Sequence, residues 1–199
     1  MSTHALPRRY HHGDLRAALL EVAEQSLRER GAGQLSLRDL AREIGVSHAA
    51  PRRHFTERQD LLDALARAGF IRLGERIDGA VAAASGLLTD QLHGAASAFA
   101  HFATENAALL ELMNATKHRG DSPDAARASD AAFAPIVGLI RESQVQHVLR
   151  AGPPEEIGFI LYATINGIAA MVNSGLVDAD RLEELTDIAV DQFLRGAAP

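Results

Sequence analysis

The chain has 199 residues, of which 47% are hydrophobic and 23% charged, a balance that excludes a disordered chain and fits a soluble globular protein. It contains no cysteine, which excludes disulfide scaffolds, thiol nucleophiles and cysteine-ligated metals. Alanine, leucine and arginine are abundant and long runs of valine, isoleucine and threonine are absent, so we predict an all-α fold. The N-terminus lacks the apolar run of a signal peptide, and Ile157–Val172 is interrupted by polar residues and too short to span a bilayer. We therefore expect a cytoplasmic protein without a membrane segment.

The net charge of −6 is divided unevenly along the chain. Residues 1–60 hold ten arginines against eight acidic residues, a balance of +2, whereas residues 61–199 hold ten basic residues against eighteen acidic ones, a balance of −8. A basic segment on an acidic body indicates a local surface for a polyanion. The division leads us to expect two domains, 1–60 and 61–199.

The first expected elements are two helices separated by glycines. Apolar residues recur at helical spacing from Asp14 to Arg30, and Gly31 and Gly33 follow. Ser36, with Asp39 three residues later, predicts an N-cap for a short helix over Leu37–Ile44.

A tight turn and two more helices are expected next. Gly45 ends the short helix, since a left-handed backbone costs glycine little. Ser47 predicts the cap of a third short helix reaching about His54, with Pro51 at its fourth position. Thr56 and Gln59 form a further predicted capping pair, which opens a long helix.

Two short helices joined by Gly45-Val46-Ser47 within a three-helix unit form the helix-turn-helix pattern. On the pattern alone, an ordinary helical hairpin is the alternative. The segments Tyr10–Arg16, Ser36–Pro51, His54-Phe55 and Leu61-Leu62 resemble the DNA-binding domain of the TetR family of bacterial transcription regulators. They resemble in particular a subgroup with a Tyr-His-His-Gly start and Ser-His-Ala-Ala-Pro in the recognition helix.

The resemblance implies a set of DNA-contacting residues: Ser36, Arg38, His48, Ala49, Arg52, Arg53, His54 and Arg58. We expect Arg53 and His48 to reach base edges in the major groove, with Ala49 allowing close approach. Phosphate contacts are expected from Arg52, Arg58, Ser36 and Arg38. The family usually has tyrosine where this chain has Arg52 and lysine where it has Arg58. Arg8 and Arg9 are candidates for a minor-groove arm; the alternative for each arginine is a solvated surface charge.

The sequence contains few residues in patterns typical of a metal site or a catalytic site. His11, His12 and Asp14 are close together, but no further ligand completes a site at helical spacing. No Ser-His-Asp order, glycine-rich phosphate loop or Gly-x-Ser-x-Gly elbow is present. We therefore expect no metal, no cofactor and no enzymatic activity.

The remainder of the chain predicts further helices. The first begins at Thr89 and has His101 facing solvent and four residues on its inner face: Leu92, Ala96, Phe99 and Ala103. A short helix over Asn106–Met113 and a polar loop over Thr116–Ala125 are expected next. Three longer helices are expected after the loop, over Asp130–Leu149, Glu155–Ser174 and Asp180–Arg195.

The predicted helix Glu155–Ser174 is apolar nearly all round, which requires burial on more than one side. A second subunit can supply that burial, and the alternative is a core helix within one chain. In the resembled family the last two helices pair with their mates, so we expect a homodimer that binds an inverted repeat of operator DNA.

The larger domain is expected to bind a small, mostly apolar ligand. Apolar bulk with a few polar groups selects the candidates Phe99, Phe102, Leu109, Met113, Phe133, Ile136, Ile140, Tyr162 and Asn166, although core packing is the alternative for each. The sequence thus predicts a repressor that a small molecule releases from its operator. The alternatives are an activator or partner-controlled regulator of the same fold, or a helical enzyme.

Overall fold

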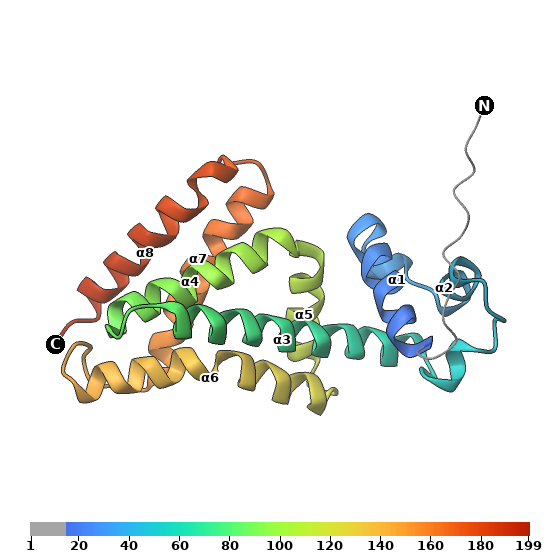
Figure 1. The fold of residues 1–199 in the computed structure, drawn as a ribbon, viewed down its shortest axis with the longest axis horizontal. Helices are drawn as coiled ribbons and strands as arrows, with labels where there is room; N and C mark the ends of the chain where they lie inside the picture. Colours follow the sequence, from blue (N-terminus) through green and yellow to red (C-terminus); the bar gives the residue numbers. More distant parts are fainter. Residues whose placement is uncertain (1–14) are drawn as a thin grey trace. The chain divides into compact units, whose positions relative to one another are not determined.

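The computed structural model describes residues 15–199 (Figure 1). Over this range the chain forms eight α-helices and three short 3-10 turns without a strand, which confirms the all-α prediction. The chain divides between Leu65 and Ala66 into two compact units. The expected assignment of residues 1–60 to DNA binding and of residues 61–199 to ligand binding and dimerisation remains a prediction.

The first unit is built from α1 (Leu15–Arg30), the turn η1 (Ala32–Gln34), α2 (Leu37–Ile44), the turn η2 (Pro51–Arg53) and the beginning of α3 (Arg58–Ala83). Its core consists of side chains at most 6% exposed: Ala18, Leu19, Ala23, Leu27, Leu35, Leu40, Ala41, Phe55, Leu61, Leu62 and Leu65. These residues repeat at three- and four-residue intervals along each helix, so each helix buries one face.

Both predicted capping pairs in this unit are wrong in detail. The side chain of Ser36 makes no cap hydrogen bond, although α2 has the predicted bounds. At the start of α3, the N–H of Glu57 donates to Oδ2 of Asp60 at 3.0 Å, one residue later than the predicted pair of Thr56 and Gln59. An aspartate three residues into the helix accepts the orphan N–H as a glutamate or glutamine would.

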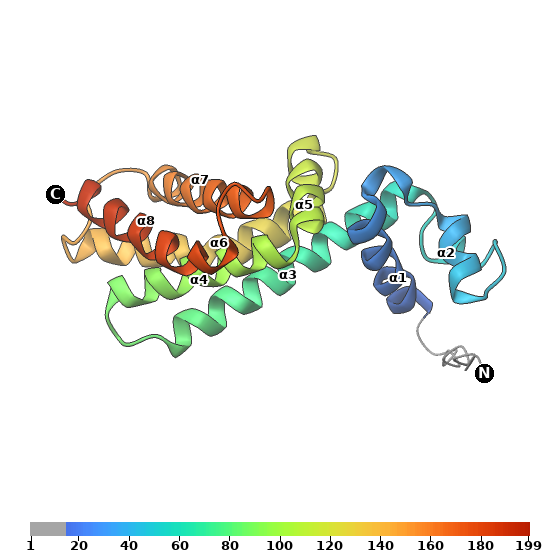
Figure 2. The same ribbon diagram turned by 90° about the horizontal axis from the view of Figure 1, so that it is seen from above.

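The second unit holds the rest of α3 together with α4 (Leu88–Glu105), α5 (Ala107–Arg119), α6 (Pro123–Val145), α7 (Pro154–Asn173), the turn η3 (Ala179–Arg181) and α8 (Leu182–Gly196). Figure 2 shows α4, α7 and α8 side by side, and each of these three helices contacts the other two. The predicted inner face of α4 is buried at all four positions.

The predicted polar loop Thr116–Ala125 is wrong, because α5 continues to Arg119 and α6 already begins at Pro123. The basic side chains in the last turn of α5 interact favourably with the negative end of the helix dipole, so these polar residues are compatible with a helix. Gly120, with φ of +76°, ends α5, and Pro123 suits the first turn of α6 because its missing N–H needs no partner there.

The helix α7 has 20 residues and reaches the length and apolar composition of a membrane-crossing helix, contrary to the expectation from Ile157–Val172. One such helix is weak evidence for a membrane span, since helices of soluble bundles meet the same criteria. The helix packs against α4, α6 and α8. Its end is fixed to α4, where Nδ2 of Asn173 donates to the carbonyl oxygen of Ala103 at 3.2 Å.

Candidate nucleic-acid interface and cavity

The turn after α2 depends on Gly45. This residue has φ of +79° and ψ of 28°, a left-handed conformation that strains other residues. The N–H of Val46 then donates to the carbonyl oxygen of Ala41 at 2.9 Å and closes the end of the helix. No heavy atom lies within 4 Å of a Cβ built on Gly45, so the backbone angle, not lack of space, calls for glycine.

The predicted third helix from Ser47 to His54 is wrong. The N–H of Ala50 donates to the carbonyl oxygen of Ser47 at 2.9 Å, and the 3-10 turn η2 follows over Pro51–Arg53. Pro51 has no N–H to donate to Ser47; the N–H groups of Arg53 and His54 donate to carbonyl oxygens three residues earlier, and that of Phe55 donates four residues back to Pro51. Consecutive side chains in such a turn point about 120° apart, compared with about 100° in an α-helix.

The segment from His48 to Phe55 has a buried anchor and an exposed polar side. Pro51 is buried and Phe55 is only 2% exposed, with the guanidinium carbon of Arg16 above its ring at 5.5 Å from the centroid. The predicted contact residues here are all exposed: His48, Ala49, Arg52, Arg53 and His54. At α2, Arg38 on the helix is exposed, and Ser36, which precedes the helix as its N-cap residue, is half-buried. Two arginines and two histidines are therefore exposed within this one segment of the first unit.

Arg58 has a structural role that the sequence did not predict. Its Nε donates to the carbonyl oxygen of Leu35 at 2.8 Å, and its Nη2 donates to the carbonyl oxygen of Ala32. The side chain thus ties the start of α3 to the turn η1. The assignment of Arg58 to phosphate stays a prediction, and only the guanidinium's remaining donors are available for it.

The second unit contains a cavity of about 640 Å³ lined by residues of α3, α4, α5, α6 and α7. Of the residues expected at a ligand pocket, Phe99, Phe133, Ile136 and Tyr162 lie on its wall. The others lie off the wall: Phe102, Leu109, Met113, Ile140 and Asn166. Phe102 and Met113 are at most 1% exposed and pack in the core instead.

Three rings form the centre of the cavity wall. The centroids of Phe99 and Tyr162 are 5.2 Å apart, and those of Phe133 and Tyr162 are 5.5 Å apart with the rings at 87°. Phe99 and Phe133 complete the cluster at 6.1 Å. Such tilted and edge-to-face pairs are stabilised by the quadrupoles of the rings. The exposed ring of Phe159 stacks on Tyr162 at 6.1 Å.

Polar groups that the sequence did not select complete the wall. The hydroxyl of Tyr162 donates to Oδ1 of Asn114 at 3.2 Å; burial raises the pKa of Tyr162, and this hydrogen bond opposes the rise. Nζ of Lys117 donates to Oγ of Ser129 at 2.9 Å. The wrongly predicted loop after residue 115 hid Lys117, which lies one helical turn after Asn114 on α5.

The chain's N-terminal segment matches a known family. Residues 19–65 match the model of the bacterial regulatory proteins, tetR family. The TetR family transcriptional regulator PfmR from Thermus thermophilus has a similar fold, with a TM-score of 0.70 and 22% identity over 89% of this chain and 97% of that chain. A TetR family transcription regulator from Marinobacter aquaeolei has a TM-score of 0.73 and 14% identity over 88% and 93%. Residues 19–65 therefore form a TetR-type N-terminal domain, and the fold of the chain is TetR-like.

A protein of unknown function from a Rhodococcus species is more similar to this chain. It is 39% identical, with a TM-score of 0.88, over 96% of this chain and 100% of that chain. No curated protein matches the chain. The subgroup resemblance stays an expectation, and its Tyr10–Gly13 motif lies outside the described residues, as do Arg8, Arg9, His11, His12 and Asp14.

Large apolar side chains remain exposed on the last two helices of the chain and on the connection between them. Phe159 and Ile160 on α7 are each 62% exposed, and Met171 on α7, Leu176 after it and Ile188 on α8 are also exposed. Ile168, in contrast, is only 8% exposed and packs within the chain. We call Phe159, Ile160, Met171 and Ile188 the apolar face.

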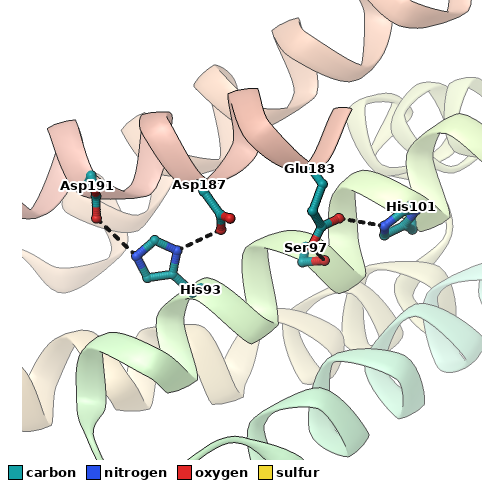
Figure 3. A network of polar contacts seen from close by, with 6 residues as sticks. All are labelled: His93, Ser97, His101, Glu183, Asp187 and Asp191. Atoms are coloured by element: carbon teal, nitrogen blue, oxygen red, sulfur yellow. Dashed lines mark hydrogen bonds and ion pairs between the residues drawn. The ribbon is translucent and has the colours of Figure 1, made fainter. Parts of the chain in front are cut away.

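A polar seam joins α4 to α8 (Figure 3). Both ring nitrogens of His93 meet carboxylates, Nδ1 at 2.9 Å from Asp187 and Nε2 at 3.2 Å from Asp191. His101, which was expected to face solvent, is half exposed and lies 2.7 Å from Glu183. Among residues 15–199, no group of three or more histidine or acidic side chains is placed to hold a metal ion.

Proposed function

We propose that this chain is a homodimeric, cytoplasmic repressor that a small, mostly apolar molecule releases from operator DNA. The observation that carries the proposal is the aromatic-walled cavity in a chain whose N-terminal segment is a TetR-type helix-turn-helix. Its volume lies within the range of about 300–1,000 Å³ common for small-molecule sites. We assign the chain no catalytic role.

The DNA contacts are assigned to the exposed turn between Ser47 and Phe55. Arg53 and His48 read base edges, Ala49 allows close approach, and Arg52 binds phosphate. On the flanking helices, Ser36, Arg38 and the free donors of Arg58 contact the backbone, and His54 supports the turn's contacts. The exposure of these groups, apart from half-buried Ser36, supports the assignment.

The apolar face is assigned to the dimer interface. A protein surface that exposes clustered large apolar side chains usually marks an interaction site. A symmetric pair of α7 and α8 helices buries these side chains and presents two helix-turn-helix units to two half-sites, so the operator is an inverted repeat.

The ligand acts through α3, which begins in the first unit and continues along the second, where Phe70 lies on the cavity wall. A shift of α3 on ligand binding alters the register of the DNA-binding unit. Because coupling between two sites is reciprocal, ligand and operator weaken each other's binding by the same factor.

Selection of bound sequences from random DNA by the full-length chain tests the proposal. We expect an enriched inverted repeat, and a screen of metabolites for thermal stabilisation then supplies compounds that weaken operator binding. A chain that enriches no sequence contradicts the DNA-binding function. A stabilising compound with equal affinity in the presence and absence of operator contradicts the release mechanism.

A further inference from the structure

Lys117 is the single lysine of a chain with nineteen arginines, and it lies on the cavity wall. An ammonium group is a compact charge with three donors on a flexible stem, whereas a guanidinium is a broad planar fork. The cavity wall therefore has a compact cation on a flexible stem, whereas all the other basic side chains of the chain except histidine are the bulkier arginine.

The protein provides a hydrogen-bond acceptor for only one of the three N–H donors of this ammonium group. Its hydrogen bond goes to the neutral hydroxyl of Ser129 at 2.9 Å. The carboxylate of Asp130 is 3.7 Å away, beyond hydrogen-bond distance, and that side chain is 79% exposed, so solvent screens the pair. The two remaining N–H donors of Lys117, whose side chain is 44% exposed, are available to a ligand.

The second basic group on the wall differs from Lys117. Nη2 of Arg141 donates to Oε1 of Glu155 at 2.6 Å, so this guanidinium already has a carboxylate in hydrogen-bond contact. Of the lysine and arginine side chains on the wall, Lys117 on α5 is consequently the one without a carboxylate in hydrogen-bond contact.

Asn114 adds neutral donors beside Lys117. The two residues are three apart on α5 and so share one face of the helix, with Cβ atoms about 5–6 Å apart. Because the hydroxyl of Tyr162 donates to Oδ1 of Asn114, the amide nitrogen of Asn114 faces elsewhere with both its hydrogens. An ammonium and an amide N–H on one helix face suit an anion with two acceptor oxygens.

The rest of the wall suits an aromatic ring. Phe99, Phe133 and Tyr162 offer both ring faces and ring edges at centroid separations of 5.2 to 6.1 Å. Along α6 the wall extends from Asp130 to Arg141, which corresponds to about 16 Å at the rise of an α-helix. A ligand of two joined rings fits that length.

We propose that the cavity binds an aromatic carboxylate, with its rings among Phe99, Phe133 and Tyr162 and its carboxylate on Lys117 and Asn114. This inference rests on the proposed role of the cavity as the ligand site. It replaces a general apolar ligand by a molecule with one anionic end.

Calorimetric titration of the full-length chain with biphenyl-4-carboxylate, biphenyl-4-methanol and biphenyl-4-methylamine tests the inference. We expect the carboxylate to bind at least about tenfold more tightly than the alcohol, with the amine weakest, since a hydrogen-bonded charge pair contributes more than a neutral pair. Lys117→Met should remove the preference for the carboxylate. The matched control Arg127→Met removes a positive charge of α6 that is not on the cavity wall and should retain the preference.

Equal or tighter binding of the alcohol or the amine, no binding of the carboxylate, or unchanged carboxylate binding by Lys117→Met would each overturn the inference. A second measurement needs no substitution: because Lys117 is the single lysine of the chain, growth with ¹³C-lysine labels it alone, keeps its charge and all three N–H donors, and gives an NMR signal for its Cε. The carboxylate should shift this signal and the alcohol should not; an unmoved signal also overturns the inference.

Neither measurement involves DNA, so the two proposals fail separately. Carboxylate binding by a chain that selects no DNA sequence contradicts the repressor function and leaves the ligand class standing. A chain that binds an operator but does not bind the carboxylate contradicts the proposed ligand class and is consistent with the repressor function.

Discussion

The hydroxyl of Tyr162 on α7 lies 3.2 Å from Oδ1 of Asn114 on α5, so the polar end of a half-buried ring is held by a neighbouring helix. Burial raises the pKa of Tyr162 above 10.0 and the hydrogen bond only partly opposes this. The folded chain therefore keeps a proton that the unfolded chain loses above about pH 10. The stabilising contribution is complete below that pH and disappears as the pH rises through the folded-state pKa.

We predict that the free energy of unfolding falls more steeply above about pH 10 for the native chain than for Tyr162→Phe, which keeps the ring and cannot ionise. Urea unfolding at several pH values measures this. The chain has two tyrosines, so a Tyr10→Phe background isolates the tyrosinate absorbance of Tyr162. A transition at or below the ordinary value would show that burial does not control this group.

Two isoleucines of α7 should behave in opposite ways when replaced by aspartate. Ile160→Asp puts a charge on the apolar face and should give a folded monomer, because Ile160 is 62% exposed within one chain. Ile168→Asp should instead unfold the chain, since Ile168 is 8% exposed and an uncompensated buried charge costs about 3–5 kcal/mol. Analytical ultracentrifugation and circular dichroism separate the outcomes. If the Ile160→Asp variant is still a dimer, the dimer interface does not include this face of α7.

Two glycines of α3 provide a second matched pair. A Cβ at Gly74 would lie 3.1 Å from the backbone Cα of Ala132 on α6, whereas a Cβ at Gly79 would meet no atom within 4 Å. Gly79→Ala should raise the free energy of unfolding by up to about 1 kcal/mol through helix propensity. At Gly74 the same gain is opposed by overpacking of about 1–3 kcal/mol, so the substitution should destabilise. Denaturant unfolding decides; equal effects at both positions would mean that α3 and α6 are not tightly apposed.

The adjacent Arg52 and Arg53 are assigned different tasks on DNA. In the turn η2 their side chains point about 120° apart, so one can face the bases while the other faces the backbone. Arg52→Ala should weaken binding to all sequences alike and lower the salt slope by about one unit. Arg53→Ala should relax the preference at one base pair of each half-site, where a bidentate arginine discriminates by about 1–3 kcal/mol. Operator profiles over a salt series measure both, and an exchange of the two effects would reverse the assigned orientation.

The sequence alone determined the features that depend on neighbours along the chain. The bounds of α2 and the left-handed Gly45 follow from local spacing and backbone sterics, and the buried face of α4 follows from its helical repeat. The same local logic found α7 within one residue at each end. It was wrong at Ser47–His54, where the missing N–H of Pro51 changes the hydrogen-bond pattern, and at residues 116–125, where polarity suggested a loop.

Only the tertiary structure decided which side chains meet at the cavity. Phe99 and Phe102 lie on the same helix and are both buried, yet Phe99 lies on the cavity wall and Phe102 packs in the core under Arg76. Helical periodicity gives the direction of a side chain around the axis of its own helix, but a cavity arises where α3, α4, α5, α6 and α7 do not fill the space between them. For the same reason the sequence could not show that Lys117 is held by Ser129 twelve residues later, because that contact depends on how α5 packs against α6.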